Sequence, residues 1–434
     1  MYRLNPFIHI FRKNNILALY NTLSLSTLYF REDEYDEIIN NPTKELIDTG
    51  YFVDENFMPI EYVSQFIPKN NKPQINIAYF LVSSGCNFNC KYCFIETRVN
   101  ELSNTLMSKE IAKKGVELIK RNTDNVKIIF YGGEPLLNFD VIKFVVEELE
   151  KTNIKSSYSI ISNGSIINDE IINLIKKYKF SVSISLDGLE QANDEMRIDH
   201  NNKGTFQKVK ETLRKLKEND VKFGISCTIS NSNLNKPNEI FEILEEFDVK
   251  GFGYNLLTEN NNVVISDDLK SLMVDNILLA ADTIIEKKII EDRVINRKLK
   301  PFVEKRNWTK DCAGYGHQFV ITPKGEVGPC HGLWPDLMND DTKTYFDLTV
   351  DYKGDITENP IWKEWFARTP YNMPQCWSCF AIGLCGGGCA KNSLIRKGSI
   401  WEVDEDICIL SKKSVEWAVW KYYDMAVNQI IENK

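Results

Sequence analysis

Three cysteines stand close together in the stretch Ser84 to Phe94, which reads SGCNFNCKYCF. Cys86, Cys90 and Cys93 follow a C-x3-C-x2-C spacing on a predicted loop. Thiolates ligate iron–sulfur clusters, and a tight loop can aim three of them at one cubane. The fourth iron then has no protein ligand and can bind a small molecule that carries an amine and a carboxylate. A zinc site that lacks one ligand, or a chance spacing, is the alternative.

Seven further cysteines lie in a stretch rich in Gly, Trp and Pro. They are Cys312, Cys330, Cys376, Cys379, Cys385, Cys389 and Cys408. In a chain without a secretion signal, such groups indicate metal binding or catalysis before disulfides. A zinc ribbon would employ four of these cysteines and leave three without a role. The eleventh cysteine, Cys227, lies in an alternating apolar stretch and is expected to be a small buried side chain.

The composition excludes several classes of protein. A chain of 434 residues is long enough for a large catalytic domain and one or two smaller modules. A net charge of -8 without a Lys/Arg block disfavours a nucleic-acid partner. No run of about 18 apolar residues predicts a membrane span, and the first residues lack the apolar core of a secretion signal. We therefore expect a cytoplasmic protein that binds neither nucleic acid nor a membrane.

The elements that must position the first cysteine group alternate between β-rich runs and amphipathic helical stretches. Six strands are predicted, at Ile75–Ser83, Val126–Tyr131, Tyr158–Ser162, Ser181–Leu186, Lys222–Ile229 and Gly251–Leu256. A helical stretch follows each strand, for example Asp140–Thr152 and Phe206–Glu218. This alternation predicts an α/β fold with a parallel sheet, here a partial (β/α)6 barrel that is open on one side. Chemistry belongs at the C-terminal ends of such strands, where the cysteine loop falls.

The cysteine loop, with its aromatic residue before the last cysteine, resembles the radical S-adenosylmethionine (SAM) superfamily. The resemblance extends from Ile75 to about Ile290, and the second strand ends in Gly132-Gly133-Glu134-Pro135, which is similar to the family's GGEP motif. It implies a radical SAM core at residues 75–300 and a [4Fe–4S] cluster on the three cysteines that binds SAM.

The resemblance also implies a set of SAM contacts. Tyr92 would lie against the adenine, Glu134 would hold the methionine amino group, and a serine together with Arg197 would bind the carboxylate. The implied SAM-binding residues are Tyr92, Gly132, Gly133, Glu134, Ser162, Asn163, Ser185, Arg197, Asn255 and Leu256. A solvated helix charge is the alternative reading of Arg197.

The order of the C-terminal cysteines resembles the SPASM extension of radical SAM enzymes that modify peptides. The resemblance implies two auxiliary [4Fe–4S] clusters, so that the chain would hold three clusters in all. One auxiliary cluster would be held by Cys376, Cys379, Cys385 and Cys408, and the other by Cys312, Cys330 and Cys389. Gln318 occupies the position where some relatives have a further cysteine, which leaves the three-cysteine cluster an open site. A substrate thiolate, a water, His317 or His331 would fill that site.

The remaining segments complete the expected domain organisation. Residues 1–74 predict a small α+β module, in which Ile8–Phe11 and Leu17–Phe30 are strand-like, an acidic helix begins at Glu32, and Pro68–Pro73 is a linker. The SPASM domain is expected at residues 301–415 and a C-terminal helix at 416–434, within a helical pattern that begins near Leu410. The N-terminal module resembles in outline the leader-peptide recognition element of peptide maturases; a structural cap over the barrel is the rival interpretation.

Taken together, these resemblances imply a maturase that acts on a ribosomally made precursor peptide. A 5′-deoxyadenosyl radical would remove a hydrogen from a peptide residue, and the substrate would close an oxidative crosslink, either a thioether or a carbon link. Reduced flavodoxin or ferredoxin is the expected electron donor. The base is not fixed by the sequence, and its candidates are Asp187, Glu259 and His331.

Three alternatives stay open. A formylglycine-generating enzyme that matures sulfatases is the first, although His331 stands where those relatives have an aspartate base after the cysteine equivalent to Cys330. A radical SAM dehydrogenase of a small metabolite is the second. A non-catalytic iron–sulfur protein that binds peptides is the third, and intact SAM-binding motifs argue against it.

Overall fold

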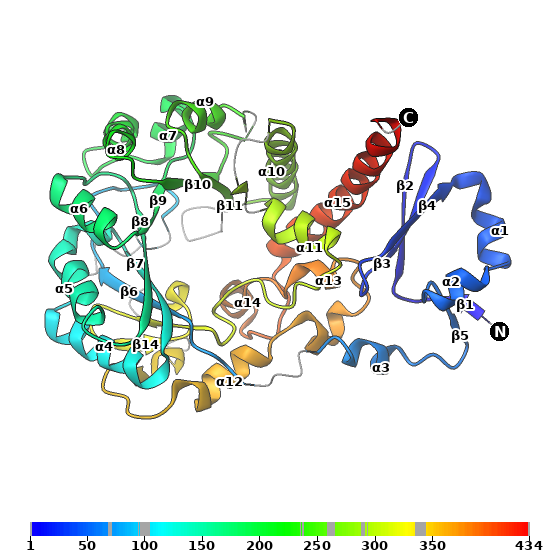
Figure 1. Ribbon diagram of the computed structural model, residues 1–434, viewed down its shortest axis with the longest axis horizontal. Helices are drawn as coiled ribbons and strands as arrows, with labels where there is room; N and C mark the ends of the chain where they lie inside the picture. The colour runs from blue at the N-terminus through cyan, green and yellow to red at the C-terminus, as the bar shows by residue number, and fades with distance from the viewer. Residues whose placement is uncertain are drawn as a thin grey trace. The chain divides into compact units, whose positions relative to one another are not determined.

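The computed structural model describes residues 2–67, 72–93, 95, 105–234, 236, 238–257, 265–287, 291–292, 294–334 and 344–432. The chain forms two compact units (Figure 1). The barrel unit comprises Lys72–Arg293 and Ala313–Phe366, and the terminal unit comprises Met1–Asn71, Val294–Cys312 and Ala367–Lys434.

The barrel unit contains a sheet whose central strands are parallel. These strands are β6 (Ile77–Ser83), β7 (Asn125–Gly132), β8 (Lys155–Ser162), β9 (Ser181–Ser185), β10 (Phe223–Ile229) and β11 (Gly251–Leu256), paired in sequence order. All six predicted strands are present, with ends that differ by at most about three residues, an ordinary uncertainty for element boundaries. Pairing among the described residues does not close the sheet, whose edge strands are β12 (Glu291–Asp292) and β15 (Leu348–Thr349). The predicted open α/β barrel is therefore confirmed.

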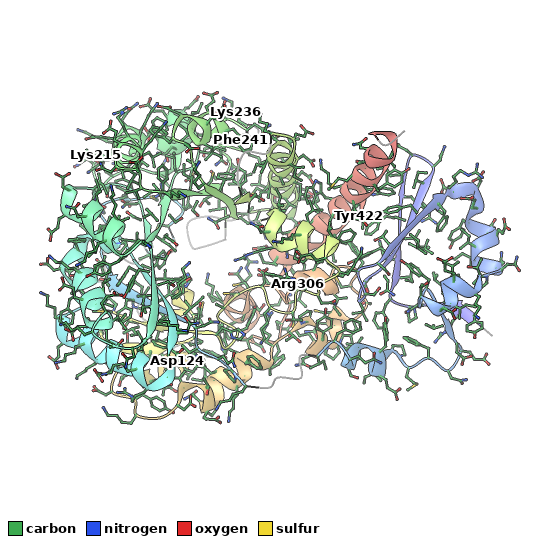
Figure 2. The ribbon with its side chains drawn as sticks, in the orientation of Figure 1. Asp124, Lys215, Lys236, Phe241, Arg306 and Tyr422 are labelled. Atoms are coloured by element: carbon green, nitrogen blue, oxygen red, sulfur yellow. The ribbon has the colours of Figure 1, made fainter. Side chains whose placement is uncertain are left out.

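Helices cover the outer side of this sheet (Figure 1). They are α4 (Lys109–Asn122), α5 (Phe139–Leu149), α6 (Asp169–Lys177), α7 (Glu190–Met196), α8 (Phe206–Glu218), α9 (Ile240–Glu246) and α10 (Asp267–Lys287). On α8 the buried positions Val209, Leu213 and Leu216 recur at helical spacing, as a helix that packs on a sheet requires. Lys215 and Lys236 lie on the outer side of this layer, whereas Phe241 of α9 is buried against Phe252 of β11 (Figure 2).

Three strands from beyond residue 312 extend the sheet past β6. β13 (Gln318–Ile321) pairs with β6 in parallel, and β14 (Glu326–Gly328) and β15 follow in antiparallel order. The sequence had predicted no strand here, because β13 is buried at all four positions and shows no alternation of polar and apolar residues. The short helix α12 (Pro360–Ala367) follows. This addition places Cys330, directly after β14, in the barrel unit.

The terminal unit begins with small antiparallel sheets. β2 (Ile8–Lys13), β3 (Ile16–Asn21) and β4 (Thr27–Arg31) form a three-stranded meander, and β1 (Tyr2–Leu4) pairs with β5 (Phe52–Asp54). The helices α1 (Tyr35–Asn40), α2 (Lys44–Asp48) and α3 (Pro59–Ser64) complete this part. The predicted strands within residues 8–30 and the acidic helix after them are therefore present.

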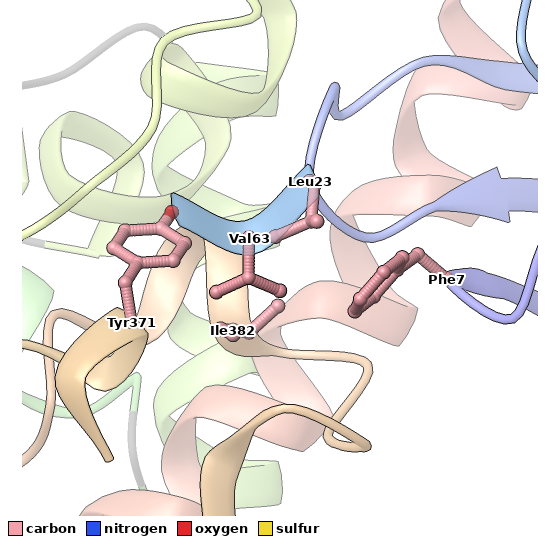
Figure 3. Close-up of a cluster of buried hydrophobic side chains, with 5 residues drawn as sticks. All are labelled: Phe7, Leu23, Val63, Tyr371 and Ile382. Carbon is pink, nitrogen blue, oxygen red and sulfur yellow. The ribbon is translucent and has the colours of Figure 1, made fainter. Parts of the chain in front are cut away.

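The N-terminal residues share a hydrophobic core with the cysteine-rich segment (Figure 3). Phe7, Leu23 and Val63 pack with Tyr371 and Ile382, and all five side chains are at most 5% exposed. The rest of the terminal unit folds into short helices, α11 (Lys300–Val303), α13 (Ile382–Cys385) and α14 (Ala390–Lys397), and the long α15 (Glu405–Glu432). None of the helices that the structure describes has the length and apolarity of a membrane span.

Candidate functional site

The first cysteine loop lies at the C-terminal edge of the parallel strands, directly after β6. Its backbone is bonded to the segment that follows α7: Asn89 donates from its N–H to the carbonyl of Ile198 (2.7 Å), and Lys91 donates to that of Met196 (2.9 Å). Cys86, Cys90 and Cys93 are each partly buried. The three thiols therefore belong to one loop that the fold holds in place.

Gly132 and Gly133 let this loop pass close to the end of β7. A Cβ atom on Gly132 would lie 2.2 Å from the carbonyl oxygen of Ser83, and one on Gly133 would lie 2.2 Å from that of Gly85. Gly132 also has a φ of +141°, which other residues rarely adopt. The N–H groups of Gly133 and Glu134 donate to the carbonyls of Ser83 and Gly85, both at 2.9 Å. The two glycines thus allow the cysteine loop to approach the end of β7. Their contact with SAM stays a prediction.

Glu134 is fully buried and bonded within the fold. Its carboxylate accepts from the Ser162 hydroxyl (2.9 Å), the Asn163 N–H (2.8 Å) and the Leu136 N–H (3.0 Å). Burial raises the pKa of this carboxyl to about 7, against the effect of the hydrogen bonds. A carboxylate offers about four acceptor positions, so a ligand ammonium fits as one further donor.

Asn163 reaches the first cysteine directly. Its side-chain amide lies 3.5 Å from the sulfur of Cys86 and donates to the carbonyl oxygen of the Asn87 side chain at 3.0 Å. Asn87 in turn bonds the hydroxyl of Ser165 (2.8 Å). From the sequence, Asn163 was predicted only as a SAM contact, and Asn87 was not predicted to belong to the site. A hydrogen bond between residues 76 positions apart leaves no pattern in the chain.

Tyr92, Asp187 and Arg197 form one buried group. The Tyr92 hydroxyl donates to Asp187 Oδ2 (2.5 Å) and accepts from Arg197 (2.6 Å). Asp187 is 0% exposed and Arg197 is 6% exposed, so Arg197 is not the solvated helix charge of the alternative reading. Burial raises the pKa of the Asp187 carboxyl, although Arg197 and the Tyr92 hydroxyl oppose that rise.

The remaining predicted SAM contacts lie at the same edge of the sheet. Ser185 ends β9, where it pairs with Ser226 of β10, and the Asn255 amide of β11 donates to the Ser226 hydroxyl (2.7 Å). Leu256 ends β11. Glu259, one of the candidate bases, lies outside the described residues.

His331 is packed between two tyrosines of the barrel unit. Its ring is stacked on Tyr79 (5.0 Å between centroids) and meets Tyr131 edge-on (5.1 Å). Phe80 faces helix α4, because a Cβ atom on Gly115 of that helix would lie 2.9 Å from the Phe80 ring. The alternation along a strand therefore turns Tyr79 to the inner face of the sheet. His331 thus lies on the inner face of the barrel, while a role as base or ligand stays a prediction.

The residues at this edge fit a SAM-binding cluster. Three thiols on one loop suit three irons of a cubane, and metal binding has to displace the proton of Cys86, whose pKa burial raises to about 12. The Nε atom of Arg197 is a buried donor that has no hydrogen-bond partner among the described residues. This unused guanidinium donor lies close enough to Cys90 for the two charges to influence each other, and it can serve a ligand carboxylate.

The four cysteines predicted to share an auxiliary cluster all lie in the terminal unit. Their thiols are close enough for the charges of Cys376, Cys379 and Cys385 to raise the pKa of Cys408, although burial contributes most. The guanidinium of Arg368 is fully buried beside them and donates to the carbonyl of Glu402 (3.0 Å) and to the Ser393 hydroxyl (3.3 Å). The sequence did not single out Arg368, because nothing in its neighbourhood predicts burial of a charge.

The cysteines predicted for the three-cysteine cluster divide between the units. Cys312 and Cys389 belong to the terminal unit, where the N–H of Cys389 donates to Asp404 (3.0 Å). Cys330 and Gln318 belong to the barrel unit, and the Gln318 amide donates to the carbonyl of Pro329 (2.9 Å). His317 is half-buried and bonds the carbonyl of Gln74 (3.1 Å). Among the described residues no three His, Cys, Asp or Glu side chains converge on a point as the ligands of a single metal ion do.

A segment of the barrel unit matches a known protein family. Residues 80–257 match the radical SAM superfamily. The chain therefore contains a radical SAM domain. This domain family is one of enzymes, and it implies SAM and a [4Fe–4S] cluster.

Two relatives and two solved structures extend over most of the chain. The radical SAM cyclopropyl synthase TigE of Paramaledivibacter caminithermalis is 26% identical over 93% of this chain and 86% of its own. A cysteine-type anaerobic sulfatase-maturating enzyme of Clostridium novyi is 25% identical over 71% of this chain and 86% of its own. Native anSMEcpe with bound AdoMet has a TM-score of 0.67 at 22% identity and covers 82% of this chain and 100% of its own. Streptococcus suis SuiB with bound S-adenosylmethionine has a TM-score of 0.57 at 16% identity and covers 94% and 99%.

Proposed function

We propose that the chain is a maturase that uses SAM to modify a ribosomally made precursor peptide and forms an oxidative crosslink within it. The observation that carries this proposal is the group of three partly buried thiols on one loop, together with the buried, unused donor of Arg197 near Cys90. Peptide-modifying relatives support the substrate class: SuiB has been solved with the precursor peptide SuiA bound, and TigE is a cyclopropyl synthase.

The residues of this chain hold and orient the cluster and SAM, and these cofactors supply the chemistry. When bound, the reduced cluster on Cys86, Cys90 and Cys93 together with SAM supplies a radical that removes a hydrogen atom from the substrate. Glu134, fixed by Ser162 and Asn163, accepts the methionine ammonium, and Arg197 binds the carboxylate. The inner-face position of Tyr79, Tyr131 and His331 puts them on the wall that a substrate in the barrel meets.

The proposal also includes two auxiliary clusters, so that the chain would hold three [4Fe–4S] clusters. Cys376, Cys379, Cys385 and Cys408 hold one cluster, and the mutual influence of their thiol charges supports it. Cys312, Cys330 and Cys389 would hold the other, which would leave an open site for a substrate thiolate, a water or a side chain. When bound, an auxiliary cluster would supply an acceptor for the electron released as the peptide radical closes its ring. Reduced flavodoxin or ferredoxin delivers the electron that starts the cycle.

The N-terminal sheet is proposed to bind the leader of the precursor. The meander β2–β3–β4 has two edge strands, and an extended peptide can add to either one. Deleting residues 1–74 would remove Phe7, Leu23 and Val63 from the shared core, so point substitutions test this better. The alternation of the antiparallel ladder turns the N–H groups of Arg12 and Thr27 outward from β2 and β4. Arg12→Pro or Thr27→Pro should therefore weaken binding of a leader peptide, and unchanged binding by both would leave the module as a structural cap.

Sulfatase maturation is the second candidate, favoured by the 25% identity to the Clostridium novyi enzyme. A carboxylate base after the second auxiliary cysteine would support it, but His331 stands in that position. Incubation with a cysteine-containing sulfatase peptide separates the two functions. A product that carries an aldehyde would establish the second candidate and overturn the first.

The test of the proposed function is anaerobic incubation of the reconstituted enzyme with SAM, dithionite and the short peptide encoded beside its gene. We expect formation of 5′-deoxyadenosine and loss of about two hydrogens from the peptide per crosslink, as an oxidative ring closure requires. Formation of 5′-deoxyadenosine without any change in peptide mass would contradict the peptide substrate. Its absence would contradict radical SAM activity and leave a non-catalytic peptide-binding protein.

A further inference from the structure

The arginine expected to bind the SAM carboxylate reaches an aspartate only through a tyrosine. Arg197 Nη1 lies 2.6 Å from the Tyr92 hydroxyl but 4.0 Å from Asp187 Oδ2. A guanidinium that pairs directly with a carboxylate uses two of its donors side by side. The interposed hydroxyl uses one, and the buried Nε of Arg197 has no partner among the described residues.

Asp187 is anchored from several sides of the barrel. Its Oδ1 accepts from the Thr228 N–H at the end of β10 (2.9 Å), and its carbonyl accepts from the Asn233 amide (2.8 Å). Its own N–H donates to the Asn193 side chain of α7 (3.3 Å). The second oxygen, Oδ2, accepts from Tyr92. An aspartate with no exposed surface and both oxygens bonded inside the fold is built to fix its neighbour, whereas a general base must reach the proton that it removes.

Tyr92 joins this anchor to the cluster loop, because it stands between the ligands Cys90 and Cys93. A shift of its ring would move the loop that carries the thiols and the guanidinium that depends on its hydroxyl. We propose that Asp187 is a positioning residue for SAM, which acts through the Tyr92 hydroxyl to hold the Arg197 guanidinium with a donor left for the SAM carboxylate. This inference rests on the proposed binding of SAM at this edge of the barrel.

The experiment compares Asp187→Asn, Tyr92→Phe and the double variant as reconstituted full-length enzyme. The dissociation constant of SAM is measured anaerobically, together with the change that SAM causes in the EPR spectrum of the reduced cluster. We expect each single variant to bind SAM about tenfold or more weakly, since each breaks hydrogen bonds to a charged group. The double variant should bind no more weakly than the weaker single variant, because both changes break the same chain of contacts.

A structural role alone would give a different pattern. For a positioning role we expect that the variants keep their iron content, that their KM for SAM rises, and that their rate of 5′-deoxyadenosine formation recovers at saturating SAM. Cys227→Ala is the matched control, because it removes a buried side chain that contacts Asn233 (3.6 Å) without a bond to Tyr92 or Arg197. Its SAM affinity should equal that of the wild type.

Three results would overturn the inference: wild-type affinity in Asp187→Asn, additive losses in the double variant, or an equal loss in Cys227→Ala. Tyr92→Phe removes a single oxygen atom and decides the question if Asp187→Asn does not hold its cluster. Wild-type affinity in Tyr92→Phe would then overturn the inference. Failure of the wild type to bind SAM would instead overturn the proposed function on which the inference rests.

Discussion

The side-chain amide of Asn163 lies 3.5 Å from the sulfur of Cys86 and joins the end of the third barrel strand to the first cysteine. Hydrogen bonds to the sulfurs are one of the factors that set the potential of an iron–sulfur cluster. The same asparagine places its N–H on the buried carboxylate of Glu134. The end of β8 is thereby connected to both the cluster loop and the GGEP motif.

Replacement of this asparagine should make the cluster harder to reduce. Asn163→Ala removes a donor to the Cys86 sulfur, and a lost hydrogen bond of about 1 kcal/mol corresponds to about 40 mV in a one-electron couple. An EPR-monitored titration should show a midpoint potential that is lower by about that amount. Ser165→Ala is the control, because it removes the contact to Asn87 and keeps the contact to sulfur. An unchanged potential in Asn163→Ala would mean that the amide does not act on the cluster.

The close passage of Gly133 and Gly85 predicts that the GGEP glycine cannot carry a side chain. Gly133→Ala would place a Cβ atom 2.2 Å from a backbone oxygen, so the cysteine loop has to move. We expect the purified protein to lose most of the iron of the first cluster, as measured by iron analysis and EPR. Gly251→Ala in β11 is the control, because a Cβ atom there meets nothing within 4 Å. A Gly133→Ala protein that keeps all of its iron would show that the backbones of Gly133 and Gly85 leave room for a Cβ atom.

Removal of two thiols from the four-cysteine set should delete one cluster and spare the others. With three cubanes the reconstituted enzyme holds about twelve irons, and the variant Cys385→Ala/Cys408→Ala should hold about eight. SAM cleavage in the absence of peptide should persist, since the first cysteine loop lies in the other compact unit. An iron content that does not fall would show that these cysteines hold no cluster.

The shared core of the terminal unit predicts a stability difference between two neighbouring positions of α3. Val63 is 0% exposed and packs with Tyr371 and Ile382 (Figure 3), whereas Ile60 is 55% exposed. Val63→Ala should lower the free energy of unfolding by about 2 kcal/mol, because it removes two buried methyl groups and leaves a cavity. Ile60→Ala should change it by at most about 0.5 kcal/mol. Urea unfolding followed by circular dichroism measures both, and equal effects would mean that α3 does not pack in this core.

The sequence predicted the barrel well because its strands and helices carry clear periodicities. All six strands and the helix Phe206–Glu218 followed from alternation and amphipathic spacing. The strands β13 to β15 did not, because β13 is buried throughout and the others have two or three residues. The last helix begins at Glu405 and not near Leu410, which places Cys408 in its first turn, where Glu405 and Asp406 favour the helix N-terminus.

The candidate site was predictable as motifs but not as contacts. The cysteines, the GGEP motif and Arg197 were apparent because residue type and spacing alone mark them. The bond between Tyr92 and Asp187 joins residues 95 positions apart and exists only once the barrel has formed. Burial of Arg368 likewise depends on the folded loops around it, since its bonds go to backbone carbonyls and one hydroxyl.

The proposed activity depends most on the ability of Cys86, Cys90 and Cys93 to hold iron that can bind SAM. The most direct measurement compares the wild type, purified and reconstituted without oxygen, with the variant in which all three are alanine. The wild type should be brown and should form 5′-deoxyadenosine from SAM and dithionite, and the variant should lose about four irons and all SAM cleavage. A colourless wild type that contains zinc, or a variant that still cleaves SAM, would contradict the account.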